Sequence, residues 1–140
     1  MMLFIVSYVA LLCGGAMIIP GLGMTGRLLV QLPPVLVDWA HAPCYGLLAW
    51  LLMRGLERRA WPFGYALMTA SGASLVFGLF TEVLQASVPG RSPSASDLLL
   101  DALGIGSVVA RVLVNRSRSQ YPGPAALTAS PVAMERVSLR

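Results

Sequence analysis

The sequence predicts an all-α fold, a polytopic membrane protein with about four transmembrane helices in a compact bundle. Hydrophobic residues make up 56% of its 140 residues and charged residues only 11%, which is far from the composition of a soluble domain. Apolar runs close to the length that a helix needs to cross a bilayer, about 20 residues, recur along the chain. Prolines, glycines and arginines separate these runs, so the pattern indicates several spans rather than one.

Four segments fit this description, and they cover residues 2–19, 35–53, 61–85 and 97–114. Pro20-Gly21 ends the first span, and Pro33-Pro34 precedes the second. In the third span Pro62 falls in the first turn, where its missing N–H leaves no extra group unsatisfied. The fourth span begins at Asp97 and ends at Val114.

The arginines predict how the spans are oriented. The short link between the second and third spans holds Arg54, Arg58 and Arg59, and the segment after the fourth span holds Arg116 and Arg118. The other two loops hold only Arg27 and Arg91. Cytoplasmic loops carry the excess of positive residues, so both termini are expected on the cytoplasmic side, as four spans require.

Residues 1–114 are expected to form one transmembrane domain, and residues 115–140 a cytoplasmic tail. The tail is rich in Ser, Pro, Ala and Arg without helical periodicity, which is typical of disorder. The first span is expected to be retained, because no basic segment precedes it and no signal-peptidase pattern precedes Pro20. The net charge of +4 comes without a basic, aromatic-interleaved stripe, so no nucleic-acid partner is expected.

Polar and ionisable residues within the spans are the candidates for function, because each costs a few kcal/mol in hydrocarbon. With the orientation above they share the outer face of the membrane: Asp38, His41 and Tyr45 in the second span, Glu82 and Gln85 in the third, and Asp97 and Asp101 in the fourth. Their common depth predicts one polar cluster between three helices.

Helical spacing indicates which way these residues point, because positions three or four apart share a face. The stripes are Asp38, His41, Tyr45 and Ala49 in the second span, Ala70, Ser74, Gly78 and Glu82 in the third, and Asp97, Asp101 and Gly104 in the fourth. Small residues at this spacing let membrane helices approach closely. Glu82 is therefore expected to face protein rather than lipid.

Two segments resemble the VanZ-like family of small bacterial membrane proteins. Asp38-Trp39-Ala40-His41, followed by Tyr45-Gly46-Leu47-Leu48, is similar to the start of the family's second helix. Glu82-Val83-Leu84-Gln85, then Pro89, Arg91, Asp97 and Gly104, resembles its second signature. The chain departs from the family at Trp39, where the family often has lysine, and at Asp101, where it usually has asparagine.

The resemblance covers about residues 35–110 and implies a multi-pass protein of the bacterial cytoplasmic membrane. The family's namesake is associated with resistance to the glycopeptide teicoplanin, which acts at the outer side of the cell envelope. The resemblance carries no established reaction with it. Its implication is therefore an envelope protein with an effect on glycopeptide susceptibility.

Binding of an envelope amphiphile is the first functional hypothesis. Arg91 lies in an outer loop, where a guanidinium suits a bidentate grip on the phosphate or carboxylate of an anionic lipid or lipid-linked cell-wall precursor. The candidate binding residues are Asp38, Tyr45, Gln85, Arg91, Asp97 and Asp101. A membrane enzyme with His41 and Glu82 as catalytic acid and base is the alternative, and a non-catalytic partner subunit is a third.

Each candidate also has a structural alternative. Glu82 with Gln85 would lock helices together through hydrogen bonds, and Arg91 would pair with Glu82 or Asp97. Ser94-Ala95-Ser96-Asp97 reads as a capping box. Asp101 is expected to pair with Arg91, His41 or Tyr45, or to be protonated. No cofactor is expected, and no metal is assigned because the single histidine cannot supply a two-histidine site, with magnesium or calcium on the carboxylates as the weaker alternative. The oligomeric state is not predicted.

Overall fold

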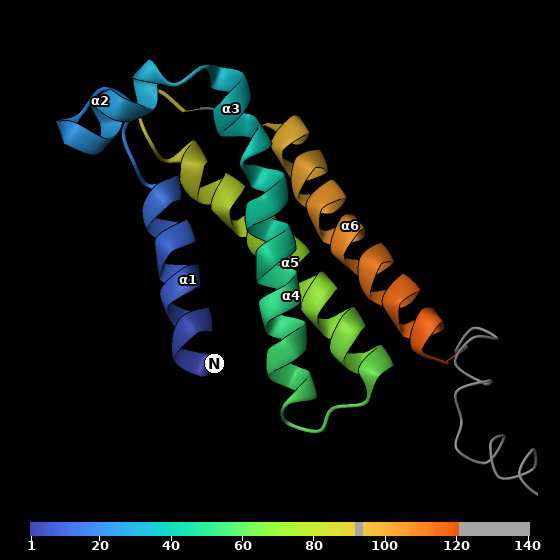
Figure 1. Cartoon of the computed structure of the whole chain (residues 1–140). Helices are drawn as coiled ribbons and strands as arrows, with labels where there is room; N and C mark the ends of the chain where they lie inside the picture. Colours follow the sequence, from blue (N-terminus) through green and yellow to red (C-terminus); the bar gives the residue numbers. More distant parts are fainter. Residues whose placement is uncertain (92–93, 121–140) are drawn as a thin grey trace, which may run out of the picture. The chain divides into compact units, whose positions relative to one another are not determined.

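The computed structural model describes residues 1–91 and 94–120, and within them every regular element is a helix (Figure 1). This confirms the all-α fold class. The elements are α1 (Met2–Ala16), α2 (Gly23–Gln31), α3 (Pro34–Trp39), α4 (His41–Glu57), α5 (Phe63–Ala86) and α6 (Ala95–Gln120). The chain divides into two compact units, Met1–Val109 and Ala110–Arg140, with the division inside α6. All candidate site residues belong to the first unit.

The second predicted span consists of two helices, α3 and α4, which meet at Ala40. The cause is Pro43, which has no N–H to donate to the carbonyl of Trp39 one turn earlier. The backbone of Ala40 stays in the right-handed helical region, and the N–H of Cys44 donates to its carbonyl at 3.2 Å. Asp38 and His41 therefore belong to different helices, although the chain path is nearly continuous.

The first, third and fourth predicted spans differ from the observed helices at their ends. The first helix ends at Ala16 instead of residue 19, and the third begins at Phe63, after Pro62. The last begins at Ala95 and continues to Gln120, beyond the expected end at Val114. The first residues of the expected disordered tail are thus helical, with Ser117 and Ser119 each donating a hydrogen bond to a carbonyl one turn earlier. The rest of that tail, 121–140, lies outside the described residues.

Helix α2 is the element that the sequence did not predict. It is a nine-residue helix, too short to cross a bilayer, and the turn that leads into it has two glycines at positive φ, Gly21 and Gly23. Gly21 (φ 79°) donates its N–H to the carbonyl of Gly26 at 2.9 Å. A side chain at Gly26 would collide with the carbonyl of Ile19, so this glycine lets α2 fold back on the end of the first apolar segment.

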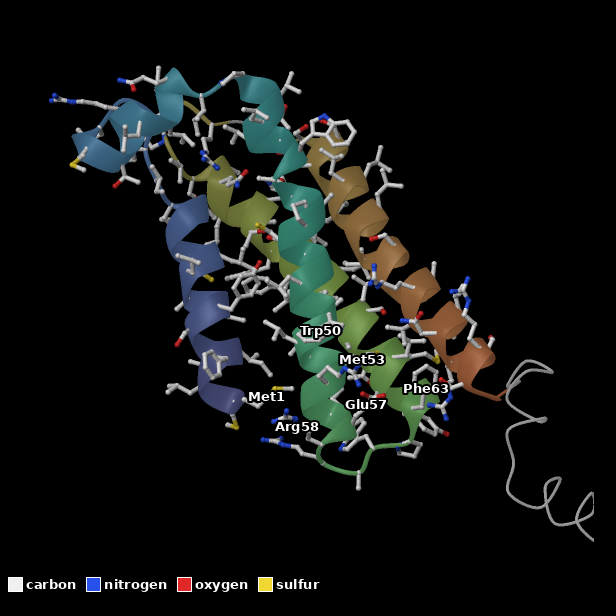
Figure 2. The ribbon with its side chains drawn as sticks, in the orientation of Figure 1. Met1, Trp50, Met53, Glu57, Arg58 and Phe63 are labelled. Carbon is white, nitrogen blue, oxygen red and sulfur yellow. The ribbon has the colours of Figure 1, made fainter. Side chains whose placement is uncertain are left out.

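Two segments are long and apolar enough to cross a membrane, Val35–Glu57 and α5. Helix α1 is apolar but shorter, and α6 is long enough but carries Asp97, Asp101 and Arg111. The link between α4 and α5 lies at one end of the first unit, and α2 and α3 lie at the other (Figure 1). One pocket lies beside this link, and its lining includes Met1, Trp50, Glu57 and Arg58 (Figure 2).

Small residues bring the helices of the first unit together. The predicted stripe of α5, Ala70, Ser74, Gly78 and Glu82, lies inside the protein, and Ala66, one turn earlier, is also buried there. On α4, Tyr45, Leu48 and Ala49 form the core with Ile105 of α6, and Tyr8, Val9 and Leu12 of α1 pack against them. The backbones of α4 and α6 touch, because a side chain at Gly104 would overlap the carbonyl of Ala42. This close packing places the polar ends of α4, α5 and α6 beside each other.

Candidate functional site

His41 is the centre of the polar cluster. Its Nδ1 lies 3.0 Å from Oδ1 of Asp101, and its Nε2 lies 3.8 Å from Oδ2 of Asp97. Asp101 is fully buried, at 0% exposure, while the His41 side chain keeps 15% of its surface exposed. The expected pairing of Asp101 with His41 is thus the one that forms. It joins α4 to α6 across sixty sequence positions.

Glu82 enters the same cluster from α5. Its Oε2 accepts a hydrogen bond from the backbone N–H of Ser94 at 2.9 Å. Its other oxygen, Oε1, is buried without a hydrogen-bond partner among the described residues. Ligand atoms of His41, Glu82 and Asp97 lie within 4.8 Å of one another. The prediction that Glu82 faces protein is confirmed.

The contact with Ser94 changes the interpretation of Asp97. In a capping box the acidic side chain would accept the N–H of Ser94, but Glu82 accepts it instead. The Ser94 hydroxyl bonds the hydroxyl of Ser96. Asp97 is left with its carboxylate directed at His41, in the first turn of α6. The predicted capping box therefore does not form, because a residue from another helix takes its donor.

Tyr45 lies one turn below His41 on α4 and stacks against it, with ring centroids 5.9 Å apart and an angle of 19° between the rings. Its hydroxyl bonds the hydroxyl of Thr81, which in turn donates to the carbonyl of Gly78 at 2.8 Å. Because Thr81 uses its proton on that carbonyl, the Tyr45 hydroxyl is the donor to Thr81. Sequence reasoning missed Thr81, although it adjoins Glu82 and follows Gly78 by one turn on the buried face of α5.

Two cavities open beside the cluster. The polar cavity, of about 390 Å³, is lined by Asp38, His41, Gln85, Arg91 and Asp97 together with apolar residues of α2 and α3. The apolar cavity, of about 320 Å³, lies against α1 and is lined by Tyr8, Leu11, Leu12 and Tyr45 among others. Leu29, Val37, His41, Gln85 and Arg91 line both cavities. A polar compartment and an apolar compartment thus meet at these residues.

The predicted site residues divide into two groups. His41, Tyr45, Glu82, Asp97 and Asp101 form the cluster. Asp38, Gln85 and Arg91 lie at the cavities instead, with Asp38 exposed and Gln85 buried. Arg91 forms no ion pair within 4.0 Å in the described part of the chain, so its expected pairing with Glu82 or Asp97 is absent there.

Comparisons of the chain with protein-family models, with curated proteins and with solved structures each find no match. The resemblance to the VanZ-like family therefore stays a prediction from the two motifs.

Proposed function

We propose that the chain is an integral membrane protein with four spans, and that its polar cavity binds the anionic headgroup of a single-chain or lipid-linked amphiphile. The proposed spans are α1 with the apolar residues after it, the segment Val35–Glu57, α5, and α6. The protein would belong to the VanZ-like family of the bacterial cytoplasmic membrane. Its effect on cells would be a change in susceptibility to teicoplanin-type glycopeptides.

The membrane placement is supported by what the helices expose. Only 22% of the most apolar part of Val35–Glu57 and 28% of that of α5 is buried, so neither is the central helix of a soluble core. Large apolar side chains lie on the surface of several helices, including Leu3 at 77%, Met68 at 76% and Val76 at 69% exposure. A surface of this kind is stable against lipid and would aggregate in water.

The orientation follows from the arginines. Arg54, Arg58 and Arg59 surround the α4–α5 link, at the end of the first unit opposite the polar cluster. Positive residues favour the cytoplasmic side, and this supports a position of the cluster and both cavities at the outer leaflet. Arg54 also lies over the ring of Trp50, 5.8 Å from its centroid. This contact is compatible with Trp50 as an anchor at the membrane–water interface.

The observation that carries the ligand class is that Arg91 lines both cavities. A guanidinium that forms no ion pair within 4.0 Å in the described chain can bind a phosphate or carboxylate in two parallel hydrogen bonds. Next to it, the apolar cavity has room for part of an acyl or prenyl chain. One molecule that has an anionic head and an apolar tail satisfies both compartments.

The test measures retention of oleoyl lysophosphatidic acid, a single-chain lipid phosphate, by purified protein in native mass spectrometry, with monooleoylglycerol as the phosphate-free comparison. Wild-type protein should retain the phosphate, and Arg91→Ala should retain at least tenfold less. Arg27→Ala is the matched control, because Arg27 is an exposed arginine on α2 that lines neither cavity. Equal retention by Arg91→Ala and wild type, or equal retention of both lipids, would reject the proposal.

A membrane enzyme is the second candidate, and the orientation of His41 favours it. The hydrogen bond between Nδ1 and Asp101 fixes the ring and leaves Nε2 available as a base. Glu82 does not line either cavity, so its carboxylate would act on His41 rather than on a substrate. Turnover of a lipid-linked phosphate that stops in His41→Gln would support catalysis, whereas binding without turnover would leave the first candidate.

A further inference from the structure

Three carboxylates surround one imidazole inside the first unit. Glu82 is 5%, Asp97 9% and Asp101 0% exposed, and His41 is the only basic side chain within 4.0 Å of any of them in the described chain. Several negative charges in a buried site are unfavourable unless protons or a cation compensate them. The cluster therefore has more carboxylates than basic side chains to compensate them, and a bound cation would supply the difference.

The geometry of the cluster matches the ligands of one metal ion. Ligand atoms of His41, Glu82 and Asp97 lie within 4.8 Å of one another, and Nε2 of His41 lies 3.8 Å from Oδ2 of Asp97. A tetrahedral ion with ligands at about 2.0–2.2 Å places them roughly 3.3–3.6 Å apart. A contraction of this size is within reach of side-chain rotation.

Glu82 supplies a second and independent indication. Its Oε1 is buried and has no hydrogen-bond partner in the described chain, while Oε2 is already bonded to the N–H of Ser94. Buried polar atoms nearly always have a partner. A metal ion between Glu82, His41 and Asp97 would give Oε1 one, and the bond from Ser94 would hold the carboxylate in place.

Asp101 would not bind the ion itself but would orient the histidine that does. Metal-binding histidines almost always donate their other ring N–H to a carboxylate or carbonyl, which fixes the tautomer. With the proton on Nδ1 donated to Asp101 at 3.0 Å, the lone pair of His41 is on Nε2, the nitrogen nearer Asp97. The imidazole is thus oriented as a ligand before any ion binds.

We propose that His41, Glu82 and Asp97 bind one divalent transition-metal ion, with Zn²⁺ the best fit, and that Asp101 is the residue that orients His41. A nitrogen with two carboxylates is a ligand set for zinc or manganese, whereas magnesium and calcium prefer oxygen alone. Three protein ligands leave a fourth position for water or a ligand, next to the polar cavity that Asp97 and His41 line.

The test uses full-length protein with a tag that contains no histidine. Protein is stripped with EDTA, dialysed against micromolar Zn²⁺, Mn²⁺ or Mg²⁺, and analysed for metal content. Wild type should hold about one zinc ion per chain and no magnesium. His41→Gln, Glu82→Gln and Asp97→Asn should each weaken zinc binding at least tenfold, and Asp101→Asn by about 10–100-fold. Glu57→Gln, a carboxylate change at the opposite end of α4, should leave it unchanged.

Wild-type protein alone provides a test that needs no folded variant. His41 is the only histidine, so carbethoxylation of histidine by diethyl pyrocarbonate reports on this site alone. Zinc should slow the reaction at least tenfold. The proposal would be overturned by an unchanged rate of carbethoxylation, by wild-type protein without zinc after dialysis, or by a zinc content in the three ligand variants equal to that of wild type. Metal binding is measured without lipid and phosphate retention without metal, so the failure of one proposal is distinguishable from the failure of the other.

Discussion

The carboxylate of Asp101 packs directly against Gly78, which has no side chain. A β-carbon at Gly78 would lie 2.5 Å from Oδ2 of Asp101 and 3.5 Å from the ring of Tyr45. The position of Asp101, and with it the ring of His41, thus depends on the absence of a side chain on a neighbouring helix.

Gly78→Ala should therefore push the Asp101 carboxylate away from its place beside His41. Crowding of a packed interior typically costs about 1–3 kcal/mol, so the midpoint of thermal unfolding in detergent should fall. Gly72→Ala is the control, because a β-carbon there meets nothing within 4 Å and alanine favours a helix by about 1 kcal/mol. An unfolding midpoint for Gly78→Ala at or above that of Gly72→Ala would contradict the contact.

Gly104→Ala should be more damaging than Gly78→Ala. The added methyl group at Gly104 would overlap the backbone of Ala42, which cannot rotate away, whereas at Gly78 it meets the end of a side chain. We expect the helices to separate, with a lower unfolding midpoint and a lower level of protein in membranes. Gly106→Ala, two residues along the same helix and with open space around it, should behave as wild type. Similar midpoints for the two variants would show that α4 and α6 are not in backbone contact.

The Tyr45–Thr81 hydrogen bond should appear as an energetic coupling. Thr81→Val leaves the buried Tyr45 hydroxyl without an acceptor, a loss of about 1–3 kcal/mol. In a Tyr45→Phe background the same change should be much less harmful, because no donor remains to be satisfied. Unfolding of the four proteins gives the coupling directly, and Thr69→Val, at an exposed position of α5, is the control. Additive effects of the two changes would exclude the bond.

The proposed topology makes a prediction about access from the two sides of the membrane. With Cys13 and Cys44 replaced by serine, a cysteine at Ser87 should react with an impermeant maleimide in intact cells. A cysteine at Ser117, exposed on α6, should react only after the cells are permeabilised. Labelling of Ser117→Cys in intact cells, or protection of Ser87→Cys there, would reject the orientation with both termini inside.

The arginines at the α4–α5 link should determine that orientation. Arg54 bonds Glu57 at 3.2 Å on an exposed surface, so this pair adds little stability, and Arg58 and Arg59 are also exposed. Replacing Arg58 and Arg59 together by glutamine should leave the unfolding midpoint nearly unchanged but make labelling of Ser87→Cys in intact cells incomplete. A large fall in the midpoint with complete labelling would assign these arginines to stability instead.

The sequence by itself determined the main helices and the buried face of α5. Proline and glycine breaks and apolar runs are local properties, and they predicted the main helices. The buried side of α5 followed from another local property, the four-residue spacing of Ala70, Ser74, Gly78 and Glu82. Local patterns also predicted that the ionisable residues lie near the same ends of their helices, since the level of a residue along a helix follows directly from its position in the chain.

Only the tertiary structure decided which polar atoms meet. The rotation and axial shift of one helix against another decide these pairings. They select His41 as the partner of Asp101, Glu82 rather than Asp97 as the acceptor for Ser94, and Thr81 as the partner of Tyr45. Those two quantities are set by close contacts such as Gly104 against Ala42 and Gly78 against Asp101. They join residues far apart in the chain, so no spacing within one helix encodes them.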